Sequence, residues 1–307
     1  MAGITGKDAI LTEYAEQLAR GADAPKGRSL SRDALRRLLR NRAAMVSIFV
    51  LVAIVVIAFV APAFMPWQPR QVDWSAFRSP PNADTLHYLG TDQNGRDLLA
   101  RLLQGTQMSI IVAIVATFVS VTIGILYGAI AGYMGGRVDA IMMRFVDMMY
   151  ALPYILFVII LVVIFGRKPI LLFIGIGAIE WLTMARIVRG QTLSLKEKEF
   201  VEAARASGVR PLSIILRHIV PNLTGPVVIY ATLTIPEIII TESFLSYLGL
   251  GVQEPQTSLG TLISDGAGVF EVMPWLLVPP AVVLVLMLLA LTYIGDGLRD
   301  ALDPKDR

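Results

Sequence analysis

Six long apolar segments constrain this chain more than any other feature of its sequence. Each offers about 20 mainly apolar residues, the length that a helix needs to cross the hydrocarbon core of a bilayer. They run over residues 45–65, 108–133, 144–165, 170–188, 219–245 and 275–294. With 55% hydrophobic residues, the composition also excludes an ordinary soluble domain. The sequence therefore predicts an all-α membrane protein with six transmembrane helices.

Lys and Arg are distributed unevenly over the segments that join these spans. If the N-terminus lies inside, only six of the 27 Lys and Arg fall on the outer side: Arg70, Arg78, Arg96, Arg101, Arg167 and Lys168. Because basic loops stay in the cytoplasm, both termini are predicted to be cytoplasmic. The first span follows about forty residues and is too long for a signal-peptide core, so it is expected to remain as a helix.

These spans divide the chain into a cytoplasmic arm, 1–44, and a six-helix membrane domain, 45–307. The domain has outer segments at 66–107 and 246–274 and a cytoplasmic loop at 189–220. In the arm, Ser31 is expected to cap a helix that carries three leucines and four arginines: Leu35, Leu38, Leu39, Arg32, Arg36, Arg37 and Arg40. Such a helix suits the surface of an anionic leaflet. A solvated basic leader is the alternative interpretation.

Small and acidic residues inside the spans are candidates for helix contacts. Gly124, Gly128 and Gly132 recur every four residues, a spacing that lets two helices approach closely in lipid. Acids inside a membrane are costly and need partners, and three are predicted: Glu180, Glu237 and Glu242. They either line a translocation path or form hydrogen bonds between packed helices. Asp147 lies near the inner end of its span, where an interfacial salt bridge is expected.

The chain lacks the residues of most catalytic and metal sites. It has no cysteine, and its two histidines, His87 and His218, are far apart, so a metal site is not expected. Asp92 and Asp97 in the first outer segment could form a metal or catalytic pair, but nothing else in the sequence supports one. No phosphate loop, H-E-x-x-H or G-x-S-x-G motif occurs. The chain is therefore not expected to be an enzyme, to bind ATP by itself, or to bind nucleic acid.

The stretch "EFVEAARASGVRPLSIILRHIVPN", residues 199–222, predicts a helical corner on the cytoplasmic side. Residues 196–207 have the composition of a helix, with Phe200, Val201 and Ala204 on one side. Gly208 can take the left-handed conformation that closes a helix, and Pro211 suits the first turn of the next one. Ala203 and Ala204 are small enough to enter a groove on another protein. An ordinary basic loop is the alternative interpretation.

Two motifs in this corner, "EAARASG" and "RHIVPN", resemble the EAA signature of the membrane subunits of bacterial ABC importers. In that family the corner is the coupling helix, which docks into a cleft on a cytoplasmic ATPase subunit and passes its movement to the transmembrane helices. The matching residues are Glu202, Ala203, Ala204, Gly208 and Pro221, and His218 and Asn222 match the peptide-transporter branch. The resemblance therefore implies an ATPase-coupling role for these residues.

The resemblance extends over most of the chain. "LGTDQNGRDLLARLLQG", "YLGLGVQEP" and "GDGLRDALDPKDR" are similar to the dipeptide and oligopeptide permease branch. Together with the C-terminal tail, "WLTMARIVRGQTLSLKEKEF" most resembles the second membrane subunit of the oligopeptide permease. Gln107 departs from the branch, which often has arginine there. An essential positive charge at this position is thereby put in doubt.

As a member of that family, the chain would have the type I ABC importer permease architecture and lie in the bacterial inner membrane. It would form half of a path for oligopeptides. Its partners would be a second permease subunit, two ATPase subunits that hold ATP and Mg, and an extracytoplasmic peptide-binding protein. No cofactor would be bound by the chain itself. Another substrate of the branch (dipeptide, murein peptide or nickel) is an alternative. A stand-alone secondary transporter is a further one, but the inverted repeats that it predicts are not evident.

Overall fold

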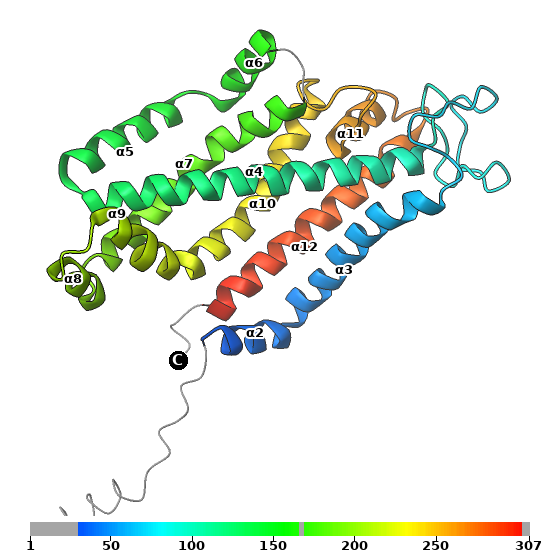
Figure 1. Cartoon of the computed structure of the whole chain (residues 1–307). Coiled ribbons are helices and arrows are strands. Elements are labelled where there is room, and N and C mark those ends of the chain that lie inside the picture. The colour runs from blue at the N-terminus through cyan, green and yellow to red at the C-terminus, as the bar shows by residue number, and fades with distance from the viewer. Residues whose placement is uncertain (1–29, 166–168, 303–307) are drawn as a thin grey trace, which may run out of the picture.

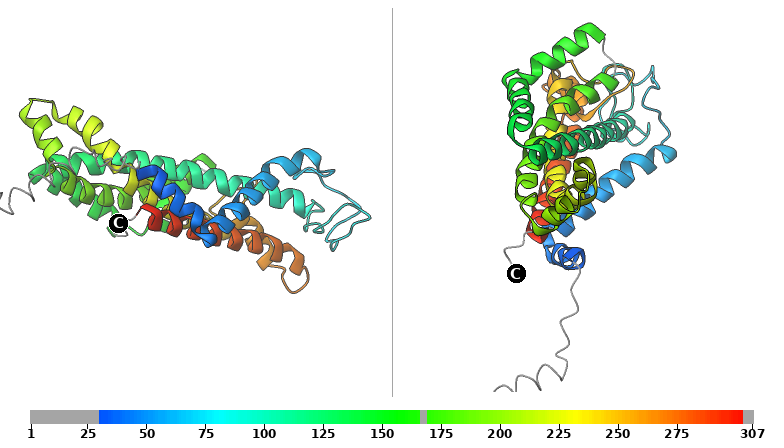
Figure 2. Two further views of the ribbon diagram at one scale, coloured as in Figure 1. Left: turned by 90° about the horizontal axis from the view of Figure 1, so that it is seen from below. Right: turned by 60° about the vertical axis from the view of Figure 1, so that its left-hand side comes forward.

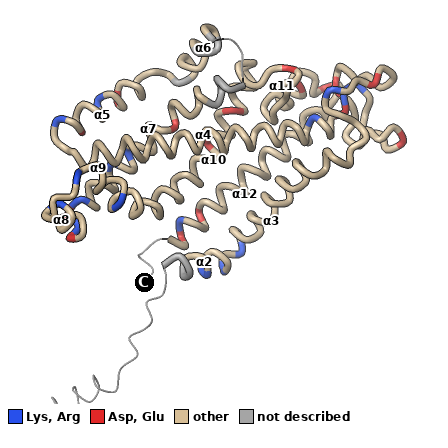
Figure 3. The backbone as a smooth tube through the Cα atoms, viewed as in Figure 1, with Lys and Arg blue, Asp and Glu red and all other residues tan. Residues whose placement is uncertain are grey.

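The protein is an elongated bundle of helices in the computed structural model, which describes residues 30–165 and 169–302 (Figure 1). The predicted arm before residue 30 and the last five residues lie outside the described part. The long helices run side by side along the bundle, and irregular loops lie at one end (Figures 1 and 2). At the opposite end lie α2, α8 and α9, where Lys and Arg gather (Figure 3).

Most of the described chain is helical, with the longest loop between η1 and α4. In order they are α2 (Leu30–Arg40), α3 (Arg42–Val60), η1 (Ala61–Phe64), α4 (Leu98–Met134), α5 (Gly136–Ala151), α6 (Tyr154–Phe165), α7 (Pro169–Leu195), α8 (Glu199–Ala206), α9 (Pro211–Ile214), η2 (Ile215–Ile219), η3 (Val220–Leu223), α10 (Thr224–Tyr247), α11 (Leu259–Ala267), η4 (Pro274–Leu276) and α12 (Val278–Leu302). Ser31, the predicted helix cap, lies inside α2, which begins one residue earlier, so that prediction is wrong.

Four helical stretches of the described residues are long and apolar enough to cross a membrane: Arg42–Phe64, Leu98–Met134, Pro211–Tyr247 and Pro274–Leu302. They coincide with the first, second, fifth and sixth predicted spans. The fourth predicted span lies within α7, which has 27 residues. The third, residues 144–165, is not one helix. It is split between α5 and α6, because the residue before a proline avoids the helical conformation and Leu152 precedes Pro153 with an extended ψ of 126°.

Two predicted helix starts also differ from the structure. The second predicted span, residues 108–133, is part of a longer helix, because α4 begins at Leu98 and runs unbroken for 37 residues. At 1.5 Å per residue α4 is about 55 Å long, which exceeds the thickness of a bilayer. The fifth span joins the preceding surface helix through η2 and η3, so its helical stretch begins at Pro211 rather than at residue 219.

The closest helix packing in the bundle is between α4 and α7, and it runs along a row of glycines. A methyl group added to Gly128 would collide with the backbone carbonyl oxygen of Ala185. At Gly124 an added Cβ would lie 2.6 Å from the side chain of Met184, and at Gly132 it would lie 2.9 Å from the carbonyl oxygen of Arg189. Only a residue without a side chain permits this approach, and close backbone contact is a main source of helix association in lipid.

Gly128→Ala should therefore destabilise the bundle by about 1–3 kcal/mol, because the backbone of α7 must shift to make room. Gly190→Ala is a matched control on α7, since nothing lies within 4 Å of a Cβ placed there. The same change in an open helical position should stabilise by about 0.5–1 kcal/mol. Thermal unfolding of the two variants in detergent measures the difference, and equal stabilities would show that α4 and α7 are less tightly packed than described.

Candidate functional site

The corner between α8 and α9 is built by one glycine. Gly208 has a φ of +74°, the left-handed conformation that the sequence predicts for it. The N–H of Gly208 donates to the carbonyl oxygen of Arg205 (3.0 Å), and the N–H of Val209 donates to that of Ala204 (3.1 Å). This pair of hydrogen bonds is the Schellman motif, which satisfies the last carbonyls of a helix while the chain turns away. The end of α8 is therefore fixed by backbone geometry.

The two faces of α8 differ from the prediction in one respect. Val201 and Ala204 are buried and pack in a cluster with α7 and α9, whereas Phe200 is 41% exposed. Glu202 and Ala203 are exposed. Of the two alanines expected to enter a partner's groove, only Ala203 is available, because α8 uses Ala204 to pack on its own chain. The outward face of α8 therefore presents Phe200, Glu202 and Ala203.

The second half of the corner widens into a π-helical turn. Pro211 occupies the first turn of α9, as its missing N–H predicts. After α9, residues Ile215–Ile219 form the π turn, and Pro221 follows it. A proline inside a helical stretch cannot donate to the preceding turn and crowds its carbonyls, so the helix is distorted there. Asn222 donates its side-chain amide to the carbonyl oxygen of His218 (2.7 Å), which satisfies one of these carbonyls.

Buried side chains attach this corner firmly to the membrane helices. Ile214, Ile215 and Ile219 are at most 3% exposed and pack with Met184 and Val188 of α7. Each fully buried aliphatic side chain contributes about 1.5–3 kcal/mol. A displacement of the exposed face of α8 must therefore move α7 or break these contacts, so the corner can transmit movement rather than absorb it.

Two ion pairs join α5 to the C-terminal half of α7. Arg189 donates through Nε and Nη2 to the two carboxylate oxygens of Asp139 (2.6 and 2.5 Å), a bidentate pair. Arg186 donates to Asp147 (2.7 Å) and lies over the ring of Tyr150. The predicted salt bridge of Asp147 is thus confirmed.

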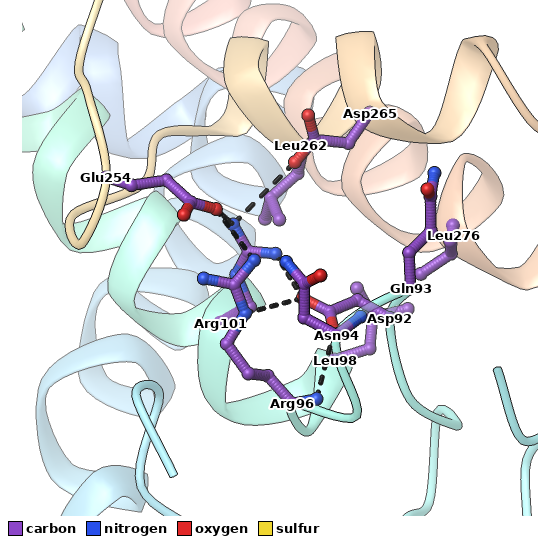
Figure 4. Close-up of a pocket in the computed structure, with 10 residues that line it drawn as sticks. All are labelled: Asp92, Gln93, Asn94, Arg96, Leu98, Arg101, Glu254, Leu262, Asp265 and Leu276. Carbon is purple, nitrogen blue, oxygen red and sulfur yellow. Dashed lines mark hydrogen bonds and ion pairs between the residues drawn. The ribbon is translucent and has the colours of Figure 1, made fainter. Parts of the chain in front are cut away.

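At the opposite end of the bundle, a cluster of five charged side chains joins the two segments predicted to lie outside the membrane, 66–107 and 246–274 (Figure 4). Its centre is Asp92, which is 5% exposed and accepts from Arg96 Nε (2.8 Å) and Arg101 Nη1 (2.5 Å). Arg96 also donates to Glu254 (2.7 Å), and Asp265 of α11 lies 3.7 Å from Arg101. These residues line a cavity of about 140 Å³.

The environment of the cluster determines how its charges behave. Burial raises the pKa of Asp265 above its ordinary value, and the positive charge of Arg101 opposes that rise. Arg101 is only 3% exposed, so its guanidinium group needs these acids as partners. A buried charge is tolerated only when it is paired and hydrogen-bonded. The cluster therefore fixes the first of these two segments to the second.

Asp97 and His87 form a second polar group beside this cluster. Asp97 caps α4 by accepting from the N–H of Ala100 (2.7 Å) and also contacts His87 Nδ1 (2.9 Å). The ring of Trp67 stacks on His87 at 4.4 Å. Asp92 and Asp97 thus serve different partners and do not form a catalytic pair. Within the described residues, no group of His, Cys, Asp and Glu side chains could hold a metal ion.

The three acids inside the spans lie in different surroundings. Glu242 is fully buried and accepts from Ser109 Oγ of α4 (3.1 Å) and Ser246 Oγ (2.7 Å), so it joins α10 to α4. Glu180 lines a small cavity of about 60 Å³ with Thr241, and Glu237 lies near enough to repel its charge. Glu237 itself is exposed.

Sequence reasoning missed the outer charge cluster and the role of Gln107. Gln107 donates its amide to the carbonyl oxygen of Ala58 (2.6 Å) and so ties α4 to the end of α3. The amide therefore acts as a hydrogen-bond donor between two helices. Arg96 and Arg101 could have been recognised in the sequence as unusual. Arg96 lies just before an apolar helical segment, and Arg101 lies within it. Their partner Glu254 could not be identified from the sequence alone.

Comparison with known protein families and proteins gives consistent matches. A family described as "Binding-protein-dependent transport system inner membrane component" matches residues 124–307, and "N-terminal TM domain of oligopeptide transport permease C" matches residues 29–81. The "Oligopeptide transport system permease protein OppC" of Haemophilus influenzae is 52% identical over 297 residues, covering 96% of both chains. The Bacillus subtilis "Dipeptide transport system permease protein DppC" is 41% identical over 291 residues, covering 94% of this chain and 90% of the relative.

A solved structure shares the fold. The inward-facing MetNI methionine ABC transporter matches with a TM-score of 0.54 and 19% identity, covering 66% of this chain and 97% of that chain. At this identity the match concerns the fold alone. It supports the arrangement of the helices independently of the sequence motifs.

Proposed function

The chain belongs to the family of binding-protein-dependent transport system inner membrane components, and on this premise we propose that it is the second membrane subunit of an ATP-driven oligopeptide importer. It is a transport subunit and not an enzyme. In the proposal it crosses the bacterial inner membrane six times, with both termini in the cytoplasm. The gathering of Lys and Arg at the end that carries α2, α8 and α9 supports this orientation (Figure 3).

The observation that carries the coupling role is the combination of an exposed face and a rigid mount at the corner. Phe200, Glu202 and Ala203 face outward, while Val201 and Ala204 hold α8 on the membrane helices. The exposed face suits insertion into a groove on a cytoplasmic ATPase subunit. Gly208, His218, Pro221 and Asn222 shape the corner and its connection to α10, so their role is to position α8 rather than to contact nucleotide.

Import by this subunit is driven through a two-state change of its helices. ATP binding brings the two ATPase subunits together, which moves the coupling corners and opens the path outward, and hydrolysis resets it. In physical terms, binding energy at one site biases a bistable helix arrangement at another. The buried contacts between the corner and α7 provide the mechanical connection.

The path itself is formed with a second permease subunit. Glu180 and Glu237 are the acids proposed to face it, since they lie near a cavity and at an exposed surface. Glu242 is proposed to be a helix-contact acid, because its carboxylate is occupied by serine hydroxyls. Gly124, Gly128 and Gly132 hold α4 on α7. We also propose that the chain divides into a cytoplasmic arm, residues 1–44, and a membrane domain, residues 45–307, which contains the coupling loop at 189–220.

The remaining partners follow from the same assignment. Two ATPase subunits bind ATP and Mg, and an extracytoplasmic binding protein delivers the peptide. The chain itself therefore needs no cofactor. The relatives include both oligopeptide and dipeptide permeases, and the match of residues 29–81 to the N-terminal domain of oligopeptide permeases supports oligopeptides as the substrate.

The first test is affinity purification through an N-terminal tag from native membranes in mild detergent. We expect a second permease and ATPase subunits in stoichiometric amounts by mass spectrometry. Ala203→Trp should lose the ATPase subunits and keep the second permease, because it places a large side chain on the exposed face of α8. Ala140→Trp, at an exposed position of α5, is the matched control and should retain both. A chain that purifies alone and still transports peptide would contradict the proposal.

A further inference from the structure

Helix α2 meets the membrane helices at a bend. Asn41 is extended (ψ 104°) between α2 and α3, and its side chain accepts from the N–H of Ala44 to start the new helix (3.2 Å). In Figure 1, α2 lies across the base of α3 rather than continuing it. It packs on α12, where a Cβ on Gly297 would lie 3.3 Å from Leu38. This short helix is therefore held at a fixed angle by the bundle.

The side chains of α2 divide into three sectors, because successive helical residues point about 100° apart. Ala34 and Leu38 face the bundle. Leu35 and Leu39 form the next sector and are each 56% exposed. Arg36 and Arg40 form a third sector, about 100° further round the helix. A helix surrounded by water would have no reason to expose two leucines in line beside two arginines.

The leucine sector is continuous with the lipid-facing surface of the bundle. In the next helix, α3, Val46 and Phe49 are 63% and 75% exposed, as expected for side chains in contact with acyl chains. Exposed apolar residues thus pass from α3 into α2 at the basic end of the molecule (Figure 3). Leu35 and Leu39 can enter the same layer only if α2 lies in the plane of the interface.

The arginine sector then points to the headgroups. Arg36 and Arg40 are exposed and have no ion pair among the side chains that the structure describes. Arg37, by contrast, lines a hollow with Asp300 of α12 and faces the protein. We infer that α2 is an interfacial helix whose leucines enter the inner leaflet and whose exposed arginines bind the phosphates of anionic lipids. This surface is separate from the coupling corner, and only the assignment to the inner leaflet rests on the orientation in the proposed function.

The test uses the absence of cysteine from the chain, which makes a single introduced thiol unique. Leu39→Cys is labelled with bimane in the full chain and reconstituted into nanodiscs. Two probe lipids, phosphatidylglycerol and phosphatidylcholine, carry a nitroxide near the head of one acyl chain, and iodide is the aqueous quencher. We expect strong lipid quenching, weak iodide quenching, and at least about fivefold enrichment of phosphatidylglycerol, which is the effect of one of the two arginines at an anionic surface.

The variant Arg36→Gln/Arg40→Gln should reduce this enrichment to unity. Its matched control is Arg137→Gln/Arg144→Gln on α5, which removes the same charge from exposed positions elsewhere and should leave the enrichment intact. Leu35→Cys provides a second label site if the first variant folds poorly. Dominant quenching by iodide would overturn the inference in favour of a solvated helix. Shielding from both quenchers would assign the leucines to a protein partner, and equal quenching by the two lipids would refute anionic recognition.

Discussion

Gly208→Val should lower ATP-coupled peptide uptake by roughly fivefold or more, while the protein still inserts into the membrane. Gly208 has a φ of +74°, which a β-branched residue adopts only under strain. Nothing lies within 4 Å of a Cβ placed at this position, so the cost comes from the backbone and not from contacts. A strain of about 1–3 kcal/mol shifts a two-state corner by roughly 5- to 150-fold. The Schellman hydrogen bonds would break and α8 would leave its position.

The matched control is Gly208→Asn, because asparagine tolerates the left-handed conformation. It should keep most of the uptake. Both variants are measured in proteoliposomes that contain the complete transporter, by peptide accumulation and by ATP hydrolysis. Full uptake by the valine variant would contradict the coupling role of the corner. Loss of uptake in both variants would show that a partner needs the space at residue 208 rather than its backbone conformation.

The corner could be predicted from the sequence because its determinants are local. A glycine that closes one helix and a proline that starts the next act within a few residues, and the structure shows both Gly208 and Pro211 as expected. Four spans could be recognised for a similar reason, since 20 apolar residues in a row leave little choice of environment. The break before Pro153 was also a local signal, but the apolar run around it concealed it.

Features that depend on distant contacts could not be predicted. Whether Ala204 faces a partner or its own bundle depends on where α7 and α9 lie, and the sequence does not state this. Arg96 and Glu254 are 158 residues apart, and a single sequence contains no information that pairs them. The same holds for Glu242, whose serine partners come from two helices. The partners of these buried polar residues were therefore not identified, although hydrogen bonding between packed helices was one of the two interpretations given for Glu242.

Asp92→Ala should destabilise the outer end of the bundle by about 3–5 kcal/mol, since removing one partner of a buried ion pair leaves the other charge uncompensated. Asp92 accepts from Arg96 and Arg101 and from the N–H groups of Asn94 (2.8 Å) and Arg96 (2.9 Å). Without it, Arg101 keeps only longer contacts, to Asp265 (3.7 Å) and Glu254 (4.0 Å). The loop before α4 would also lose the acceptor that holds its turn.

Glu254→Ala is the matched control, because it removes a second acid that pairs with Arg96. The Glu254 side chain is 61% exposed, so its ion pair with Arg96 is screened by water and contributes at most about 1 kcal/mol. Thermal unfolding in detergent and hydrogen exchange of residues 66–97 measure both variants. We expect a lower unfolding temperature and faster exchange for Asp92→Ala, and almost no change for Glu254→Ala. If the two variants behaved alike, burial would not determine the strength of this cluster, and Asp92 would not be its centre.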